Sequence, residues 1–133
     1  MPNQSFDSAR FLSEYWQKKP IVIRDFFDSF EDFVELTELQ QLAQEAAVES
    51  RLVRCNEDLG YQLQQGPFTV GELPSSQDSD WTLLIQAAEL WIPGLQQLIE
   101  QFSFLPRWRI DDIMVSYAAS GGGVGPHFDQ YDV

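Results

Sequence analysis

The 133-residue sequence predicts one domain of the α+β class, and three observations carry this prediction. Hydrophobic residues recur at helical spacing in segments 7–20, 37–50 and 81–102. A polar, glycine-containing turn joins two runs of strand-forming residues within segment 50–68. Segment 107–120 alternates larger apolar and smaller side chains, as a half-buried strand does. We therefore expect several short helices and an antiparallel sheet.

The predicted helices have recognisable starts and stops. In segment 7–20, Asp7 can cap the first turn and Pro20 ends the helix. Thr37 and Gln40 form a capping-box pattern at the start of segment 37–50. One face of that helix is expected to carry Leu39, Leu42, Ala43 and Ala46. Segment 81–102 reads as mainly helical, with Pro93 either kinking it or starting a second helix.

The strands are expected at four places. Residues 21–27 form a short β-rich run, and the two strands of segment 50–68 meet in a turn at 56–60. The strand in 107–120 should direct Ile113, Val115 and Tyr117 to one face and Met114, Ser116 and Ala118 to the other. After the glycine turn at 121–125, residues 126–133 start a further strand. That strand is unfinished where the sequence stops, so we expect a fragment of a longer protein.

The composition indicates a packed core and the cellular compartment of the protein. Ten Phe, four Trp and four Tyr among 44% hydrophobic residues are enough to fill a core. No apolar run approaches the length of a membrane span, and the first residues lack the pattern of a signal peptide. The single cysteine, Cys55, excludes an internal disulfide and fits a reducing compartment. We expect a cytoplasmic protein.

The net charge of −13 is unusual for a chain of this size. Such a field repels nucleic acid phosphates and anionic lipid, and it attracts basic partners. An acidic surface also keeps a protein soluble without any basic partner. The charge by itself does not distinguish this explanation from attraction of a basic partner. We expect no direct nucleic acid binding and no membrane binding.

The strongest chemical candidate is the pair formed by His127, the only histidine, and Asp129. On a strand, residues i and i+2 lie on the same face, about 6–7 Å apart. An imidazole and a carboxylate so placed, with a second histidine from elsewhere, make the facial triad of non-haem Fe(II) oxygenases. The tripeptide is short and common, and by itself it favours a strand histidine paired to an aspartate, or a solvated turn, over a metal site. Patterns for zinc hydrolases, phosphate-binding loops and nucleophile elbows are absent.

Five segments occur in this order along the chain: EYWQKKPIVIRDFF, SRLV, QQGPF, WTLLIQA and RIDDIMVSYAASGGGVGPHFDQYDV. Together they resemble the bacterial ribosomal oxygenases of the JmjC/cupin superfamily, and in particular their arginine hydroxylases. The resemblance implies a double-stranded β-helix, of the cupin or JmjC jelly-roll type, truncated here. It implies that residues 1–133 are the N-terminal portion of that domain, with a mixed lead-in over about 1–105 and the first jelly-roll strands over about 106–133.

The same resemblance implies Fe(II) as cofactor, with 2-oxoglutarate and O₂ as co-substrates. His127 and Asp129 match the first two iron ligands, and no catalytic residue beyond the metal ligands is implied. Ser116 matches a position that contacts 2-oxoglutarate, although an ordinary strand hydroxyl explains it as well. The third ligand, a histidine, and the basic residue that binds the far carboxylate are not in this chain. The substrate would be an arginine of a basic large-subunit ribosomal protein, and the full-length enzyme a homodimer.

Two other functions remain open from the sequence. The chain alone, without its third ligand, is expected to be inactive, and it could serve as a non-catalytic acidic module that binds basic ribosomal proteins. A cupin hydroxylase acting on a small molecule would keep the chemistry and change the substrate. The acidic composition disfavours this last alternative.

Overall fold

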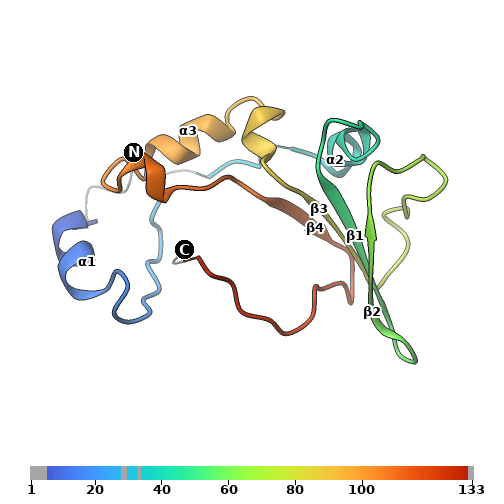
Figure 1. Ribbon diagram of the computed structural model, residues 1–133, viewed down its shortest axis with the longest axis horizontal. Helices are drawn as coiled ribbons and strands as arrows, with labels where there is room; N and C mark the ends of the chain where they lie inside the picture. The colour runs from blue at the N-terminus through green and yellow to red at the C-terminus, as the bar shows by residue number, and fades with distance from the viewer. Residues whose placement is uncertain (1–5, 28–29, 33, 132–133) are drawn as a thin grey trace.

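The computed structural model describes residues 6–27, 30–32 and 34–131, and shows short helices around one antiparallel sheet (Figure 1). The sheet has four strands in the order β2-β1-β3-β4. Their bounds are β1 (Ser50–Asn56), β2 (Gly60–Gln65), β3 (Trp81–Ile85) and β4 (Val115–Ala118). The helices are α1 (Ser8–Glu14), α2 (Leu36–Leu42) and α3 (Leu95–Glu100), with 3-10 turns η1 (Ala88–Leu90) and η2 (Arg107–Arg109). The predicted mixture of helices and antiparallel strands is confirmed.

The two faces of the sheet differ in what covers them. Alternation along the strands places Leu52, Leu83 and Ile85 on one face, where they join a buried cluster with residues of α2, η1 and α3. We call this the core face. Trp81 lies on it fully buried, with its ring stacked 5.4 Å from that of Tyr117 on β4. The opposite face, called here the second face, carries Arg51, Val53, Thr82, Leu84, Ser116 and Ala118.

The hairpin predicted in segment 50–68 is confirmed. β1 and β2 pair without a break from Arg51 with Gln65 to Asn56 with Gly60. The Asn56 side chain closes the turn, because its Oδ1 accepts hydrogen bonds from the backbone N–H groups of Asp58 (2.9 Å) and Leu59 (3.3 Å). Gly60 ends the turn at φ +67°, a backbone conformation that glycine adopts without strain.

The helix predicted over the start of segment 81–102 is wrong. Trp81–Ile85 is β3, the strand between β1 and β4, and all five residues are buried. A strand covered on both faces shows a continuous apolar run, which periodicity cannot distinguish from a buried helix. The second helix does begin after Pro93, but at Leu95, with Gly94 as its N-cap at φ +94°.

The N-terminal predictions are confirmed in part. Asp7 caps α1 through its Oδ1, which accepts from Arg10 N at 2.9 Å, but the helix ends at Glu14, well before Pro20. α2 is shorter than predicted, and its capping box uses Glu35 and Glu38 rather than Thr37 and Gln40. Ala46 lies exposed beyond the end of α2. Within 21–27 the structure has a single bridge residue, at Phe27, in place of the predicted strand.

The C-terminal strands are also shorter than predicted. β4 covers only 115–118, although the predicted faces are confirmed: Val115 and Tyr117 are partly buried, and Ser116 and Ala118 are exposed. Residues 126–131 contain no strand, and 132–133 lie outside the described residues. Within the described ranges, no helix is long and apolar enough to cross a membrane.

Candidate metal-binding site

The glycine stretch after β4 passes directly against the backbone of β3. Gly121 has φ +75°, and Gly122 donates to the carbonyl of Ala119 at 2.8 Å. A Cβ built on Gly122 would lie 2.2 Å from the carbonyl oxygen of Trp81. No side chain fits in that space, so the chain can turn here only because residue 122 is glycine.

The stretch then crosses the second face of the sheet toward β2. Thr82 donates through Oγ1 to the carbonyl oxygen of Gly123 at 3.4 Å. Gly125 lies against the ring of Tyr61 on β2, where a Cβ would come within 3.1 Å of two ring carbons. These contacts fix the position from which the His–x–Asp residues begin.

His127 is oriented by its own backbone. Its Nδ1 lies 2.8 Å from the carbonyl oxygen of Gly125, and because a carbonyl only accepts, Nδ1 must carry the proton. In the neutral ring the lone pair is then on Nε2, which lies 3.5 Å from Oδ2 of Asp129. The two side chains are 50% and 62% exposed, so the pair lies at the surface of the described structure.

The surroundings raise the pKa of His127 above its ordinary value. The hydrogen bond to the Gly125 carbonyl is the main cause, and the negative charge of Asp129 adds to it. Both favour the protonated ring. In the metal-free protein a proton therefore competes with a metal ion for Nε2 more strongly than at an isolated histidine.

The other end of the segment is held by Tyr131. Its hydroxyl donates to Oδ2 of Asp111 at 3.1 Å, and this bond raises the pKa of Tyr131. Asp111 lies before β4, so the contact joins the two ends of a stretch of about twenty residues. The pair could not be predicted from the sequence, because nothing in the spacing of the two residues signals a contact.

Ser116 lies on the second face of β4, in register with Leu84 of β3. Arg51 pairs with Leu84 from the other side, so Ser116 and Arg51 flank one leucine on the same face. Among the residues that the structure describes, the Ser116 hydroxyl makes no side-chain hydrogen bond. Arg51 donates from Nη2 to Oε1 of Gln86 at 2.6 Å, and its buried Nε has no partner in the described chain. The position of Arg51 beside Leu84 could not be predicted from the sequence, because Leu84 was expected in a helix and lies on strand β3.

The donor set fits part of an iron site. A neutral imidazole nitrogen and a carboxylate oxygen on one short segment are two of the three ligands of a facial triad. The described residues contain no group of three or more His, Cys, Asp or Glu side chains that could hold a metal ion. The structure therefore brings His127 and Asp129 together and supplies no third ligand within its described ranges.

Comparison with known proteins bears directly on this site. The family model for the JmjC domain matches residues 97–133, which include His127 and Asp129. The chain is 44% identical over 123 residues to the ribosomal protein uL16 3-hydroxylase of Escherichia coli, covering 92% of this chain and 32% of that protein. It is 42% identical to a probable ribosomal oxygenase of Haemophilus influenzae, covering 92% and 30%. The chain thus spans about a third of the length of these curated relatives.

Solved structures give the same result. The fold matches YcfD, a ribosomal oxygenase from Escherichia coli in complex with cobalt and 2-oxoglutarate, with a TM-score of 0.84 and 40% identity. That match covers 98% of this chain and 35% of the other. A complex of YcfD with cobalt and succinic acid matches with the same score and coverage. The predicted JmjC/cupin fold, present here in part, is confirmed. Over nearly its whole length, the chain is similar to one part of the bacterial JmjC-type ribosomal oxygenases, and the resemblance predicted from its sequence is confirmed.

Proposed function

We propose that this chain is the His–x–Asp part of an Fe(II)- and 2-oxoglutarate-dependent oxygenase that hydroxylates an arginine side chain of ribosomal protein uL16. The observation that carries the proposal is the paired placement of His127 Nε2 and Asp129 Oδ2, 3.5 Å apart. It occurs in a chain 44% identical to a uL16 hydroxylase and similar in fold to an oxygenase that binds cobalt and 2-oxoglutarate. The third ligand would come from chain beyond residue 133.

Each residue has a distinct part in this proposal. His127 and Asp129 would hold the metal, which together with 2-oxoglutarate supplies the activation of O₂ that protein side chains cannot provide. The Gly125 carbonyl keeps the imidazole turned so that Nε2 is the free nitrogen. Asp129 would neutralise part of the metal charge. Ser116 would donate a hydrogen bond to 2-oxoglutarate on the second face of the sheet, where its hydroxyl is exposed.

The charge of the chain supports the choice of substrate. A net charge of −13 attracts a basic ribosomal protein and speeds its encounter with the enzyme. A ribosomal substrate also places the protein in the cytoplasm. From the family resemblance we further propose that the full-length protein is a homodimer, and that residues 106–133 begin the jelly roll after a lead-in over 1–105.

The experiment uses the protein in the form that the cell makes. Cobalt(II) and 2-oxoglutarate binding are measured by calorimetry, and turnover is followed as succinate release with recombinant uL16 and as a mass gain of one oxygen on an arginine-containing peptide. His127→Ala and Asp129→Ala should lose metal binding and turnover, because each removes a ligand. Gln130→Ala, an exposed neighbour, is the matched control and should behave as wild type. Unchanged turnover in His127→Ala would contradict the proposal.

A non-catalytic acidic module that binds basic ribosomal proteins is the second candidate, and the net charge of −13 supports it. It predicts that the natural protein binds uL16 with the same affinity in wild type and His127→Ala, and that neither form binds cobalt(II). Metal binding by the wild type alone would exclude this candidate.

A further inference from the structure

Within the part of the chain that the structure describes, one edge of the sheet presents unpaired backbone groups to solvent. There β2 is the end strand, and β1 is its one neighbour in the sheet. The N–H of Gly66 donates to the carbonyl of Ser50, which sets the alternation of the ladder. In an antiparallel pair, bonded and non-bonded residues alternate, so Gln64, Gln62 and Gly60 bond to β1. The N–H and C=O groups of Tyr61, Leu63 and Gln65 are therefore directed away from the sheet.

This edge lacks the features that normally prevent strand pairing. All six residues of β2 are exposed, none is charged and none is proline. The pairing with β1 runs through without a bulge. Edge strands are usually protected by lysine, proline, bulges or a covering loop. An uncharged, regular edge of this kind can accept one more strand through backbone hydrogen bonds.

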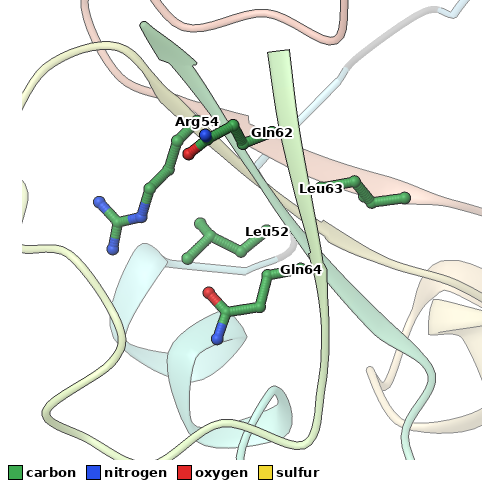
Figure 2. Close-up of a pocket in the computed structure, with 5 residues that line it drawn as sticks. All are labelled: Leu52, Arg54, Gln62, Leu63 and Gln64. Atoms are coloured by element: carbon green, nitrogen blue, oxygen red, sulfur yellow. The ribbon is translucent and has the colours of Figure 1, made fainter. Parts of the chain in front are cut away.

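A pocket lies beside the same edge, on the core-face side (Figure 2). Its volume is about 460 Å³, and it is lined by Leu52, Arg54, Gln62, Leu63 and Gln64. Figure 2 shows the Gln62, Gln64, Leu52 and Arg54 side chains on one side of the hairpin and Leu63 on the other. Arg54 donates one bond, to the carbonyl of Glu72 at 3.1 Å. The two glutamine amides make no side-chain hydrogen bond within the described residues.

The edge and the pocket together fit one kind of ligand. A strand added to β2 would direct every second side chain to the core-face side, where the pocket is. The NH₂ groups of the two amides and the remaining N–H groups of Arg54 suit a side chain that accepts hydrogen bonds, such as an amide or a carboxylate. Backbone pairing would give the affinity, and the pocket would give the selectivity.

Charge selects the polypeptide that supplies the strand. The hairpin turn next to β2 carries Glu57 and Asp58, and segment 66–80, which follows β2, carries Glu72, Asp78 and Asp80 with no basic residue. A second copy of this chain would bring another −13 charge to the edge. We propose that β2 binds an extended segment of a basic polypeptide by strand addition, with an amide or carboxylate side chain in the pocket. This binding site lies at the opposite end of the sheet from β4 and does not depend on metal chemistry.

The test uses the natural protein and a defined probe, the acetylated and amidated peptide Lys-Val-Thr-Gln-Thr-Val-Lys, carrying a fluorophore. Binding is measured by anisotropy at low ionic strength, where charge effects are strongest. Leu63→Pro removes one outward N–H without touching the ladder with β1, and Leu63→Thr keeps that N–H as the matched control. We expect Leu63→Pro to bind the peptide about tenfold or more weakly than Leu63→Thr, because both variants lose the leucine side chain at the pocket and only Leu63→Pro also loses the N–H.

Two peptide controls make the result independent of protein folding. Two versions of the peptide are N-methylated at alternate residues, and only the version whose methyl groups face β2 should lose binding. A peptide with glutamate at both ends should bind at least tenfold more weakly than the lysine peptide. If Leu63→Pro unfolds, as judged by circular dichroism, the methylated peptides decide the matter.

Three results would overturn the proposal. Equal affinity for both methylated peptides would exclude strand pairing. Equal affinity for the lysine and glutamate peptides would exclude selection by charge. Sedimentation showing a dimer that Leu63→Pro dissociates would identify a second copy of the chain as the occupant of the edge.

Discussion

Replacing Gly122 by alanine tests the inference that the glycine stretch is pressed against β3. The new Cβ would lie 2.2 Å from the carbonyl oxygen of Trp81 and 2.9 Å from that of Ala119, and both are backbone atoms. Backbone of a buried strand cannot move aside as a flexible side chain can. Overpacking of this kind costs about 1–3 kcal/mol. We expect a value near the upper end, because Trp81 is fully buried and its strand is held by both neighbours.

Gly123→Ala is the matched control, since a Cβ at residue 123 would meet nothing within 4 Å. Urea unfolding measures both variants against wild type. With a slope of about 2 kcal/mol per molar urea, a loss of about 2–3 kcal/mol lowers the midpoint by roughly 1–1.5 M. The control should shift it by less than about 0.3 M. Gly122→Ala should also weaken cobalt(II) binding, because the His–x–Asp segment begins from this turn. Equal midpoints for the two variants would refute the reasoning.

Three further predictions concern the core, the segment just before β4 and His127. Leu83→Ala should cost about 2–5 kcal/mol in urea unfolding, because Leu83 is fully buried, whereas Leu90→Ala, at a side chain 67% exposed, should cost less than about 0.5. Asp112→Ala should cost about 1–3 kcal/mol, since it removes the acceptor of Ala87 N and Gln86 Nε2 at 2.7 Å each, while Asp111→Ala should cost less than about 1. The imidazole signal of His127, assigned by NMR through its loss in His127→Ala, should titrate above the ordinary value of about 6.5 in the metal-free protein. The protonated ring cannot bind metal, so cobalt(II) affinity should fall as the pH drops through that raised pKa, and a midpoint at or below 6.5 would contradict the geometry.

The hairpin and the faces of β4 could be predicted from the sequence because their signals are local. A polar turn with Asn56 and Gly60 fixes the β1–β2 register, and alternation over 115–118 fixes which side chains face the core. β3 could not be predicted in this way. Its five residues are all buried and show no alternation, and only the presence of strands on both sides makes them a strand.

For the candidate site, the sequence predicts which residues supply the chemistry but not how they are aligned. His127 and Asp129 were identified by residue type and spacing, but the strand expected to align them is not present in 126–131. Their alignment comes instead from a carbonyl two residues earlier and from the path of the glycines over β3. The tie between Tyr131 and Asp111 joins residues twenty positions apart, and a single sequence carries no signal for such a contact.

The hydrogen bond between Tyr131 and Asp111 bears on the rate of metal binding. The segment between Asp111 and Tyr131 is a closed loop, joined at its ends by one hydrogen bond and held in the middle by Thr82. These contacts restrict the conformations of the stretch in the folded protein, before any metal arrives. If His127 and Asp129 hold a metal ion as proposed, we expect its capture to need only small side-chain adjustments and the release of a proton. In kinetic terms, we then expect metal binding that does not wait for this loop to order.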